Sequence, residues 1–276
     1  MRIAGKIQDA VLWTATLLIA LVILFPFWYM IVTSISPDHT ILAGSVTLWP
    51  GEIYFGNFVK ALTKTALVRQ FFNTVFVSLA ILALQVVTSL LAAYAFAFLD
   101  FRGKKVLFIL TLSTMMVPGE AVIISNYLTI SAWQWLDTFQ ALILPNAASA
   151  LGIFLIRQYF LTMAKEIQEA AMLDGCGHMQ FLWRIAAPLA RPIIAAFSIT
   201  SFLSSWGMYM WPLLVTSKDS MRTVQVGITS MQDVDSVLSF GMAMAAIALV
   251  TLPSLILFIA GHKQMVEGMM SGAVKG

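Results

Sequence analysis

The side chains whose types and spacing suggest chemistry lie in one polar segment, Lys165–Pro192, which reads KEIQEAAMLDGCGHMQFLWRIAAPLARP. Glu169 offers a carboxylate that an arginine of a partner protein can hold through two parallel hydrogen bonds. The adjacent Ala170 and Ala171 are small, so a partner's surface can approach closely there. These features indicate a docking surface. An amphipathic hairpin resting on lipid headgroups is the alternative that spacing alone leaves open.

The order of residues in this segment predicts a helix, a tight turn and a second helix. Lys165–Leu173 combines an apolar side with charged residues, as an amphipathic helix requires. Gly175 and Gly177 are expected to end that helix, because glycine readily adopts the positive φ of a helix end. A second helix fits His178–Ala187, and Pro188 and Pro192 are expected to end it and to start the next apolar run.

The sequence lacks the common patterns of catalytic and metal sites. It contains no G-x-x-x-x-G-K-[ST] phosphate loop, no H-E-x-x-H zinc pair and no G-x-S-x-G nucleophile turn. His39, His178 and His262 lie without ligand spacing, and Cys176 is the only cysteine. We therefore expect no catalytic residue, no metal and no cofactor in this chain. Any energy-requiring step would depend on an ion gradient or on another polypeptide.

The composition indicates a membrane protein. Of the 276 residues, 60% are hydrophobic and 11% are charged, with a mean hydropathy of +0.88. Soluble domains carry about 25% charged residues, and a soluble fold as apolar as this one could not cover its own surface. Lipid requires no charged exterior. The net charge is +3, but the basic residues form short clusters between apolar runs. That pattern is typical of loops beside an anionic membrane face and argues against nucleic-acid binding.

Six apolar runs are long enough to cross a bilayer, for which about 20 residues suffice. We therefore predict an all-α polytopic protein that forms one transmembrane domain over residues 1–276, with a cytoplasmic loop at residues 161–191. The first run is too long for a signal-peptide core of about 7–15 residues, so we expect it to be retained. The predicted spans are Ala10–Ile35, Phe72–Phe98, Val106–Leu128, Phe139–Phe160, Pro192–Val215 and Phe240–Ala260.

The distribution of lysine and arginine predicts the orientation, because these residues collect on the cytoplasmic side. With the N-terminus inside, 11 of the 16 lie inside and 5 lie outside. Both termini are therefore predicted to be cytoplasmic. The first outer loop, residues 36–70, is expected to hold a short interfacial helix. The basic residues predicted to lie outside are Lys60, Lys64, Arg69, Lys218 and Arg222.

At the polar segment the chain resembles the permeases of ABC importers, which carry an E-A-A-x-x-D-G coupling motif. Stretches at residues 93–105 (AYAFAFLDFRGKK), 152–160 (GIFLIRQYF) and 209–215 (YMWPLLV) resemble the carbohydrate branch, which includes maltose and glycerol-3-phosphate permeases. The resemblance covers essentially the whole chain. It departs at Cys176-Gly177, where the family often has alanine-serine, and at Gly207, where it often has asparagine. The residues that match the motif are Glu169-Ala170-Ala171-x-x-Asp174-Gly175, followed by Phe181, Ile185, Pro188 and Pro192.

The resemblance implies the fold of a type I ABC importer permease in a bacterial inner membrane, with no catalytic activity of its own. It implies a second, similar permease as heterodimer partner, a pair of ATPase subunits that bind ATP and magnesium, and an external solute-binding protein. The motif loop is then expected to sit in a groove of the ATPase. The residues to which the resemblance gives this ATPase-coupling role are Glu169, Ala170, Ala171, Asp174, Gly175 and Phe181.

Candidates for the solute path lie in the third, fourth and fifth predicted spans. Glu120 lies at membrane depth, where burial of a carboxylate is costly, so it either contacts solute or reaches the outer interface. Asn146 is either a solute contact or an interhelical hydrogen-bond partner. The rings of Trp206, Tyr209 and Trp211 either stack on a sugar or belong to an interfacial aromatic belt.

Two other function classes stay open on the sequence. A secondary transporter or channel subunit would need ionisable residues deep in several spans, and a membrane enzyme would need a clustered acid, base or metal site. Neither pattern is visible. The sequence does not identify the solute, and glycerol 3-phosphate, a glycerophosphodiester and a saccharide are the alternatives. The stretch MMVPGEAVIISNY, Met115–Tyr127, resembles the glycerol-3-phosphate group.

Overall fold

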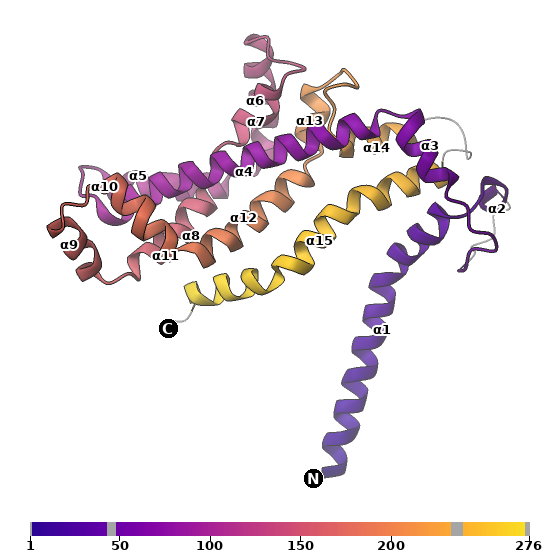
Figure 1. Ribbon diagram of the computed structural model, residues 1–276, viewed down its shortest axis with the longest axis horizontal. Coiled ribbons are helices and arrows are strands. Elements are labelled where there is room, and N and C mark those ends of the chain that lie inside the picture. Colours follow the sequence, from indigo (N-terminus) through magenta and orange to yellow (C-terminus); the bar gives the residue numbers. More distant parts are fainter. Residues whose placement is uncertain (1, 43–47, 233–239, 274–276) are drawn as a thin grey trace. The chain divides into compact units, whose positions relative to one another are not determined.

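The computed structural model describes residues 2–42, 48–232 and 240–273, which form helices joined by short turns and loops (Figure 1). No β-strand occurs in these ranges, so the all-α prediction is confirmed for them. The chain divides into two compact units, which are described separately. The first comprises Met1–Val68 and Gly227–Leu252, and the second comprises Arg69–Val226 and Pro253–Gly276.

Within the described ranges, three helices are long and apolar enough to cross a membrane unbroken. They are α1 (Arg2–Ser34), α4 (Leu67–Phe98) and α15 (Phe240–Ala273), and the apolar part of α1 is Val11–Ser34 while that of α15 is Phe240–Gln264. In lipid a helix satisfies its backbone hydrogen bonds within itself, so a continuous apolar run folds as one helix. The first, second and sixth predicted spans are confirmed, with small shifts at their ends.

The third predicted span is a bent pair of helices. α5 (Lys104–Ser113) continues through the 3-10 turn η1 (Thr114–Met116), and α6 (Gly119–Ala132) then leaves at an angle of 100°. A proline disfavours the helical conformation of the residue before it. Accordingly Val117, which precedes Pro118, is extended at φ −85° and ψ 115°.

The fourth predicted span is also broken, though its ends are close to those expected. α7 (Phe139–Ile143) and the 3-10 turn η2 (Leu144–Asn146) are followed by α8 (Ala150–Leu161), with a bend of 42° between them. Pro145 lies in η2, and the break follows at residues 147–149. Ser149 caps α8, because its hydroxyl accepts a hydrogen bond from the Gly152 N–H at 3.2 Å.

The fifth predicted span ends earlier than expected. α12 (Arg191–Trp206) stops at Gly207, and a separate short helix, α13 (Met210–Val215), follows. Glycine is a weak helix former. Pro212 lacks an N–H and would remove a hydrogen bond from a continuous helix, whereas in the first turn of a new helix that N–H is not needed. The continuous span predicted to reach Val215 is therefore wrong.

The first unit contains the predicted short helix of the outer loop, α3 (Gly56–Lys64), and another short helix, α2 (Asp38–Leu42). The amide of Asn57 is buried and donates to the carbonyl oxygens of Ser34 at 3.1 Å and Ser36 at 2.8 Å, which joins α3 to the end of α1. Lys60 Nζ lies 2.7 Å from a carboxylate oxygen of Asp38. This hydrogen bond raises the pKa of Lys60.

The second unit has two buried cores at different places along α4. The loop cluster forms where the end of α4 meets α8 and the polar segment, and the break cluster forms where an earlier part of α4 meets the broken spans. The loop cluster includes Leu90, Ala93, Tyr94, Ile156, Phe160, Ala171, Phe181 and Leu182. The break cluster comprises Val77, Ile81, Ile130, Ala141, Leu142, Ile143, Trp211 and Val215.

Candidate coupling site

The polar segment begins with a helix that has the ends expected from the sequence, α9 (Lys165–Leu173). Gly175 follows it at φ +79°, which confirms the predicted turn. The N–H of Gly175 donates to the carbonyl of Met172 at 3.1 Å, and the N–H of Cys176 donates to that of Ala171 at 2.9 Å. These two bonds form a Schellman motif, which satisfies the last carbonyls of the helix. The turn therefore depends on a left-handed residue at position 175.

The second arm is one helical run that contains a π segment. α10 (His178–Phe181) leads into the π-helical η3 (Leu182–Ala186) and then α11 (Ala187–Leu189). Of the two prolines expected to end this helix, Pro188 lies inside the run, which continues to Leu189, and Pro192 lies in the first turn of α12. Pro188 has no N–H to pair with the carbonyl of Arg184, and a π turn accommodates such an interruption. The run then bends by 80° into α12.

An aromatic cluster fixes this second arm to the membrane helices. The ring centroid of Phe181 lies 5.5 Å from that of Phe98 and 6.3 Å from that of Tyr94, both on α4. Phe98 also lies 5.4 Å from Phe160 of α8. The Tyr94 hydroxyl is 2.8 Å from His178 Nδ1, so a hydrogen bond joins α4 to the first residue of α10. The segment is thus packed on the ends of two membrane helices.

Other polar bonds complete the attachment of this end of the second unit. Arg157 of α8 donates through Nε to the carbonyl of Phe96 at 3.2 Å, and its guanidinium lies 4.0 Å from the ring centroid of Phe108. Lys104 Nζ donates to the carbonyl of Leu99 at 2.7 Å. Basic side chains at a helix end satisfy carbonyls that have no partner within the helix.

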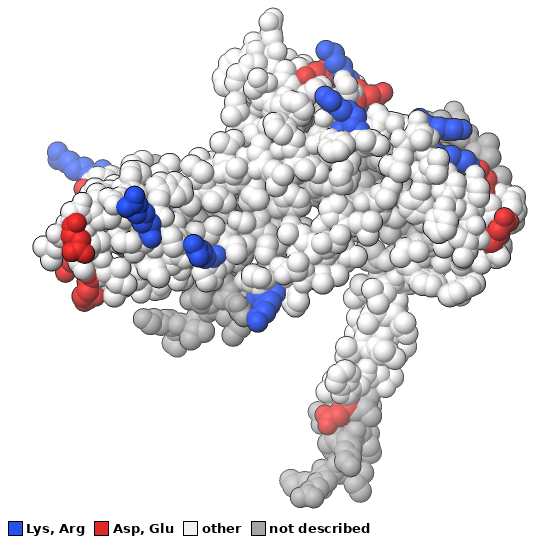
Figure 2. Space-filling view, in the orientation of Figure 1, with Lys and Arg blue, Asp and Glu red and all other residues white. Residues whose placement is uncertain are grey.

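The outward side of α9 is acidic with an apolar edge. Glu166, Glu169 and Asp174 are exposed, and Figure 2 shows acidic side chains gathered over this helix. Ala170 is exposed beside them, and Leu173 is 88% exposed. No hydrogen bond or ion pair to the Glu169 carboxylate comes from the residues that the structure describes. An exposed leucine beside free carboxylates is a surface suited to a partner protein.

Two of the motif residues lie on the inner side. Ala171 is buried against the loop cluster, and the Phe181 side chain is 1% exposed within it. These two residues hold the segment against α4 and α8, whereas Glu169, Ala170 and Asp174 face outward. The motif therefore has an anchoring side and a free side, which the sequence pattern did not distinguish.

The candidates for the solute path are dispersed over the second unit. Glu120 is exposed in the first turn of α6. Asn146 is half-buried in η2. Trp206 is 3% exposed and stacks on Phe202, and the buried Trp211 donates through its indole N–H to the carbonyl of Ala141 at 2.9 Å. The half-buried Tyr209 precedes α13. The role of these five side chains in a solute path stays a prediction.

Sequence reasoning missed Gln85, which links three elements of the second unit. Its amide nitrogen donates to the carbonyl of Asn146 at 2.8 Å, and its amide oxygen accepts from the Ser201 hydroxyl at 2.8 Å. Thr88, one turn further along α4, donates to the carbonyl of Ala147 at 3.2 Å. The break before α8 leaves these carbonyls without helical partners, and α4 side chains replace them. A glutamine inside an apolar run was the signal that could have revealed this role.

The expectation that this chain binds no metal can be compared only with the residues that the structure describes. No group of three or more histidine, cysteine, aspartate or glutamate side chains in the described ranges could hold a metal ion.

Comparison with known families decides the identity. Residues 85–265 match the family described as binding-protein-dependent transport system inner membrane component. This chain belongs to that family. The permease is therefore a non-catalytic, multi-pass component of a bacterial inner-membrane ABC transporter, and membership implies ATPase and solute-binding-protein partners. The matched residues include the whole polar segment and the broken spans.

Named relatives align with nearly all of the permease. It is 30% identical over 277 residues to the arabinooligosaccharides transport system permease protein AraQ of Halalkalibacterium halodurans, covering 98% of this chain and 99% of the relative. It is 32% identical over 258 residues to the sn-glycerol-3-phosphate transport system permease protein UgpE of Agrobacterium fabrum, covering 91% and 92%. The resemblance to the carbohydrate and glycerol-3-phosphate branch is thus confirmed.

A solved structure has the same fold. The permease matches a chain of a bacterial ABC transporter involved in the import of the acidic polysaccharide alginate, with a TM-score of 0.87. The match covers 94% of this chain and 97% of that chain at 24% identity. The predicted ABC importer permease fold is therefore confirmed.

Proposed function

We propose that this permease, together with a second, similar permease, forms the membrane path of an ATP-driven importer for a carbohydrate or a glycerol-3-phosphate-like solute. The observation that carries the proposal is the two-sided polar segment. Its inner side is packed on α4 and α8 through Phe181 and Tyr94, while its outer side leaves Glu169 free. A partner that moves the outer side therefore moves the membrane helices.

In this account the polar segment docks on an ATPase pair through α9. Glu169 forms a charge-assisted pair with a basic side chain of the ATPase, and Leu173 enters an apolar depression beside it. Closure of the ATPase dimer by ATP carries α9 with it. Because α9 is attached to α4 and α8, the spans rock between inward-open and outward-open states. The chain itself contributes differential binding and no bond-breaking step.

The solute class rests on the relatives. The names of two of them specify arabino-oligosaccharides and sn-glycerol 3-phosphate. An external binding protein is proposed to deliver the solute, and the two permeases together enclose it. The breaks at Pro118, at residues 147–149 and at Gly207 support such a path, because irregular backbone at membrane depth is found where it lines a cavity or is buried in protein.

Replacement of Glu169 tests the docking role. In the reconstituted transporter, Glu169→Ala is expected to leave the permease folded, because the side chain is exposed. It should weaken ATPase attachment by about 2–5 kcal/mol if the pair becomes buried on docking. ATPase binding to permease-containing membranes and solute-stimulated ATP hydrolysis measure this loss.

Glu52→Ala is the matched control. It removes the same exposed charge from the first outer loop, which is predicted to lie on the opposite side of the membrane. It should leave ATPase attachment unchanged. Normal attachment and normal solute-stimulated hydrolysis in Glu169→Ala would contradict the docking role and would favour a hairpin that rests on lipid.

A further inference from the structure

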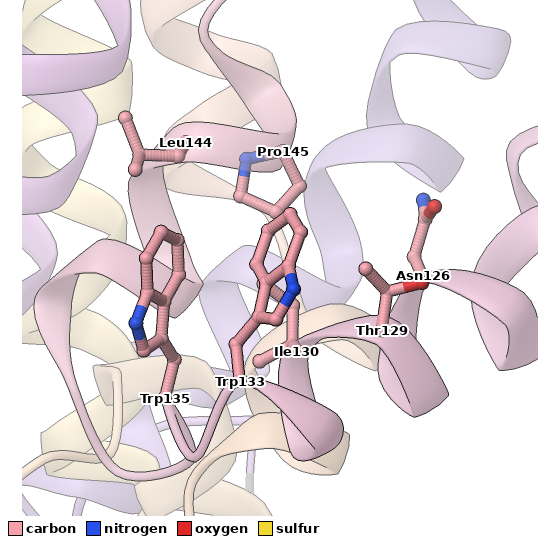
Figure 3. Close-up of a pocket in the computed structure, with 7 residues that line it drawn as sticks. All are labelled: Asn126, Thr129, Ile130, Trp133, Trp135, Leu144 and Pro145. Carbon is pink, nitrogen blue, oxygen red and sulfur yellow. The ribbon is translucent and has the colours of Figure 1, made fainter.

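A pocket of about 310 Å³ lies in the second unit between α6, the turn after it and η2 (Figure 3). Its size is at the lower end of the range of about 300–1,000 Å³ for small-molecule sites. Trp133 and Trp135 are among the residues that line it, with Pro145 on the η2 side and Asn126 and Thr129 on α6. None of its lining residues is charged.

The local sequence explains why two indole rings line one pocket. Asn126, Thr129 and Trp133 recur at helical spacing, so they share one side of α6. Gln134 follows at φ +58°, and this left-handed residue turns the chain so that the N–H of Trp135 donates back to the carbonyl of Ile130 at 3.1 Å. The two indole centroids are consequently 5.0 Å apart, with the rings inclined at 60°.

Neutral polar groups lie beside these rings. In Figure 3 the indole nitrogen of Trp133 is on the side of the ring that faces Asn126. The Asn126 amide is exposed, and no hydrogen bond to it comes from the described part of the chain. The Thr129 hydroxyl donates to the carbonyl of Ser125 at 2.9 Å and keeps its lone pairs for a ligand donor. The pocket thus offers donors and acceptors without charge.

The charge pattern argues against a phosphate. Phosphate sites use arginine, lysine or the N–H groups of a helix start. The lining has no basic side chain. Two residues after Trp135, the Asp137 carboxylate accepts hydrogen bonds from the backbone N–H of Ser217 at 2.7 Å and of Lys218 at 2.9 Å. Asp137 does not line the pocket, so it is the lack of basic side chains in the lining that argues against a phosphate.

We propose that this pocket is an outer subsite for one sugar residue of a neutral oligosaccharide. A sugar ring has an apolar C–H face, which suits an indole wall, and a hydroxyl edge, which suits Asn126, Thr129 and the Trp133 N–H. The pocket lies at the connection between the third and fourth predicted spans, which the charge bias assigns to the outside. The inference rests on the proposed function and narrows its solute from phosphate esters to neutral saccharides.

The test uses the assembled transporter in lipid nanodiscs or proteoliposomes, with its binding protein and ATPase. Diazirine-bearing arabinotriose and maltotriose are photolysed on it, and the labelled peptides are mapped. Label is expected on the peptide that contains Trp133 and Trp135, and excess unmodified trisaccharide should prevent it while glycerol 3-phosphate should not. In a second measurement, Trp133→Ala should raise the trisaccharide concentration for half-maximal ATP-driven uptake about three- to ten-fold, the range expected for a lost aromatic contact.

Two matched controls separate the pocket from its surroundings. Ile124→Ala removes an exposed apolar side chain of α6 that does not line the pocket, and Trp13→Ala removes an exposed tryptophan of α1. Both should leave the half-maximal concentration unchanged. Normal ATP-driven uptake with no competable label in the pocket, or with glycerol 3-phosphate as the accepted solute, would overturn this inference and leave the proposed function intact. Competable label in the pocket without any ATP-driven uptake would support the subsite and contradict the proposed function.

Discussion

The loop cluster and the break cluster stabilise the same helix, α4, in different ways. At the loop cluster, aromatic rings from α4, α8 and the polar segment pack into a continuous core that includes Phe181. Around the break cluster, the partner helices are interrupted, and side chains such as Gln85 bond to the backbone of the breaks. Under the proposed coupling role, the loop cluster is the rigid end of α4, which is expected to move with that helix, and the breaks form the jointed end. We therefore expect, under this proposal, that motion enters at the loop cluster and is absorbed at the breaks.

Phe181→Ala should have the largest effect, because it removes a fully buried ring from the rigid end. Loss of such a side chain costs about 3–5 kcal/mol of stability. We expect a marked fall in the thermal unfolding midpoint of the purified permease and loss of solute-stimulated ATP hydrolysis. Met179→Ala, at an exposed site two residues away, is the control and should change neither quantity. Similar effects of both variants would mean that the segment is loosely attached.

Gly175→Val should destabilise the turn through backbone strain alone. A Cβ at position 175 would meet no atom within 4 Å, but the residue has φ +79°. A β-branched residue in that conformation costs about 1–3 kcal/mol. Gly177→Val is the matched control, because Gly177 has φ −69° and the same open surroundings. Solute-stimulated ATP hydrolysis, which measures coupling, should fall in Gly175→Val and stay normal in Gly177→Val. Equal losses in the two variants would contradict a specific role for the Schellman turn.

Gln85→Leu tests the jointed end. It leaves the carbonyl of Asn146 and the hydroxyl of Ser201 without their partner, and an unsatisfied buried polar group costs about 1–3 kcal/mol. Thermal unfolding should record this loss. Val87→Ala, at an exposed site on the same helix, serves as the control. Unchanged stability in Gln85→Leu would show that the break needs no support from α4.

Tyr94→Phe should have the smallest effect. It keeps the ring in the loop cluster and removes the hydroxyl that bonds to His178 Nδ1, which is worth about 0.5–1.5 kcal/mol. A double-mutant cycle with His178→Ala on thermal unfolding isolates the pair. We expect the sum of the two single losses of stability to exceed the loss in the double variant. Strict additivity would mean that the hydrogen bond contributes nothing.

Local sequence predicted the polar segment better than the spans. The limits of α9 and the turn at Gly175 follow from amphipathic spacing and glycine chemistry, which act within a few residues. The spans were predicted from their length and apolar content, which did not locate the breaks at Pro118 and Gly207. Apolar content reports that a segment lies in lipid, and it says little about whether the helix is straight.

The inner side of the motif could not be predicted for a different reason. Burial of Ala171 and Phe181 depends on α4 and α8, whose contacting residues lie far away in the sequence. The same holds for Gln85, whose partner Asn146 is 61 residues away. The sequence shows Gln85 as a polar residue in an apolar run, but it does not show which residue Gln85 bonds to.

The accessibility of position 173 tests the central claim most directly. In a Cys176→Ala background, which removes the only native cysteine, Leu173→Cys places a thiol at the exposed end of α9. A membrane-impermeant maleimide should label it in inside-out vesicles without ATPase, and bound ATPase should protect it. Lys218→Cys should be labelled only from the outer side, with or without ATPase. Equal labelling of Leu173→Cys in the presence and absence of bound ATPase would contradict the account.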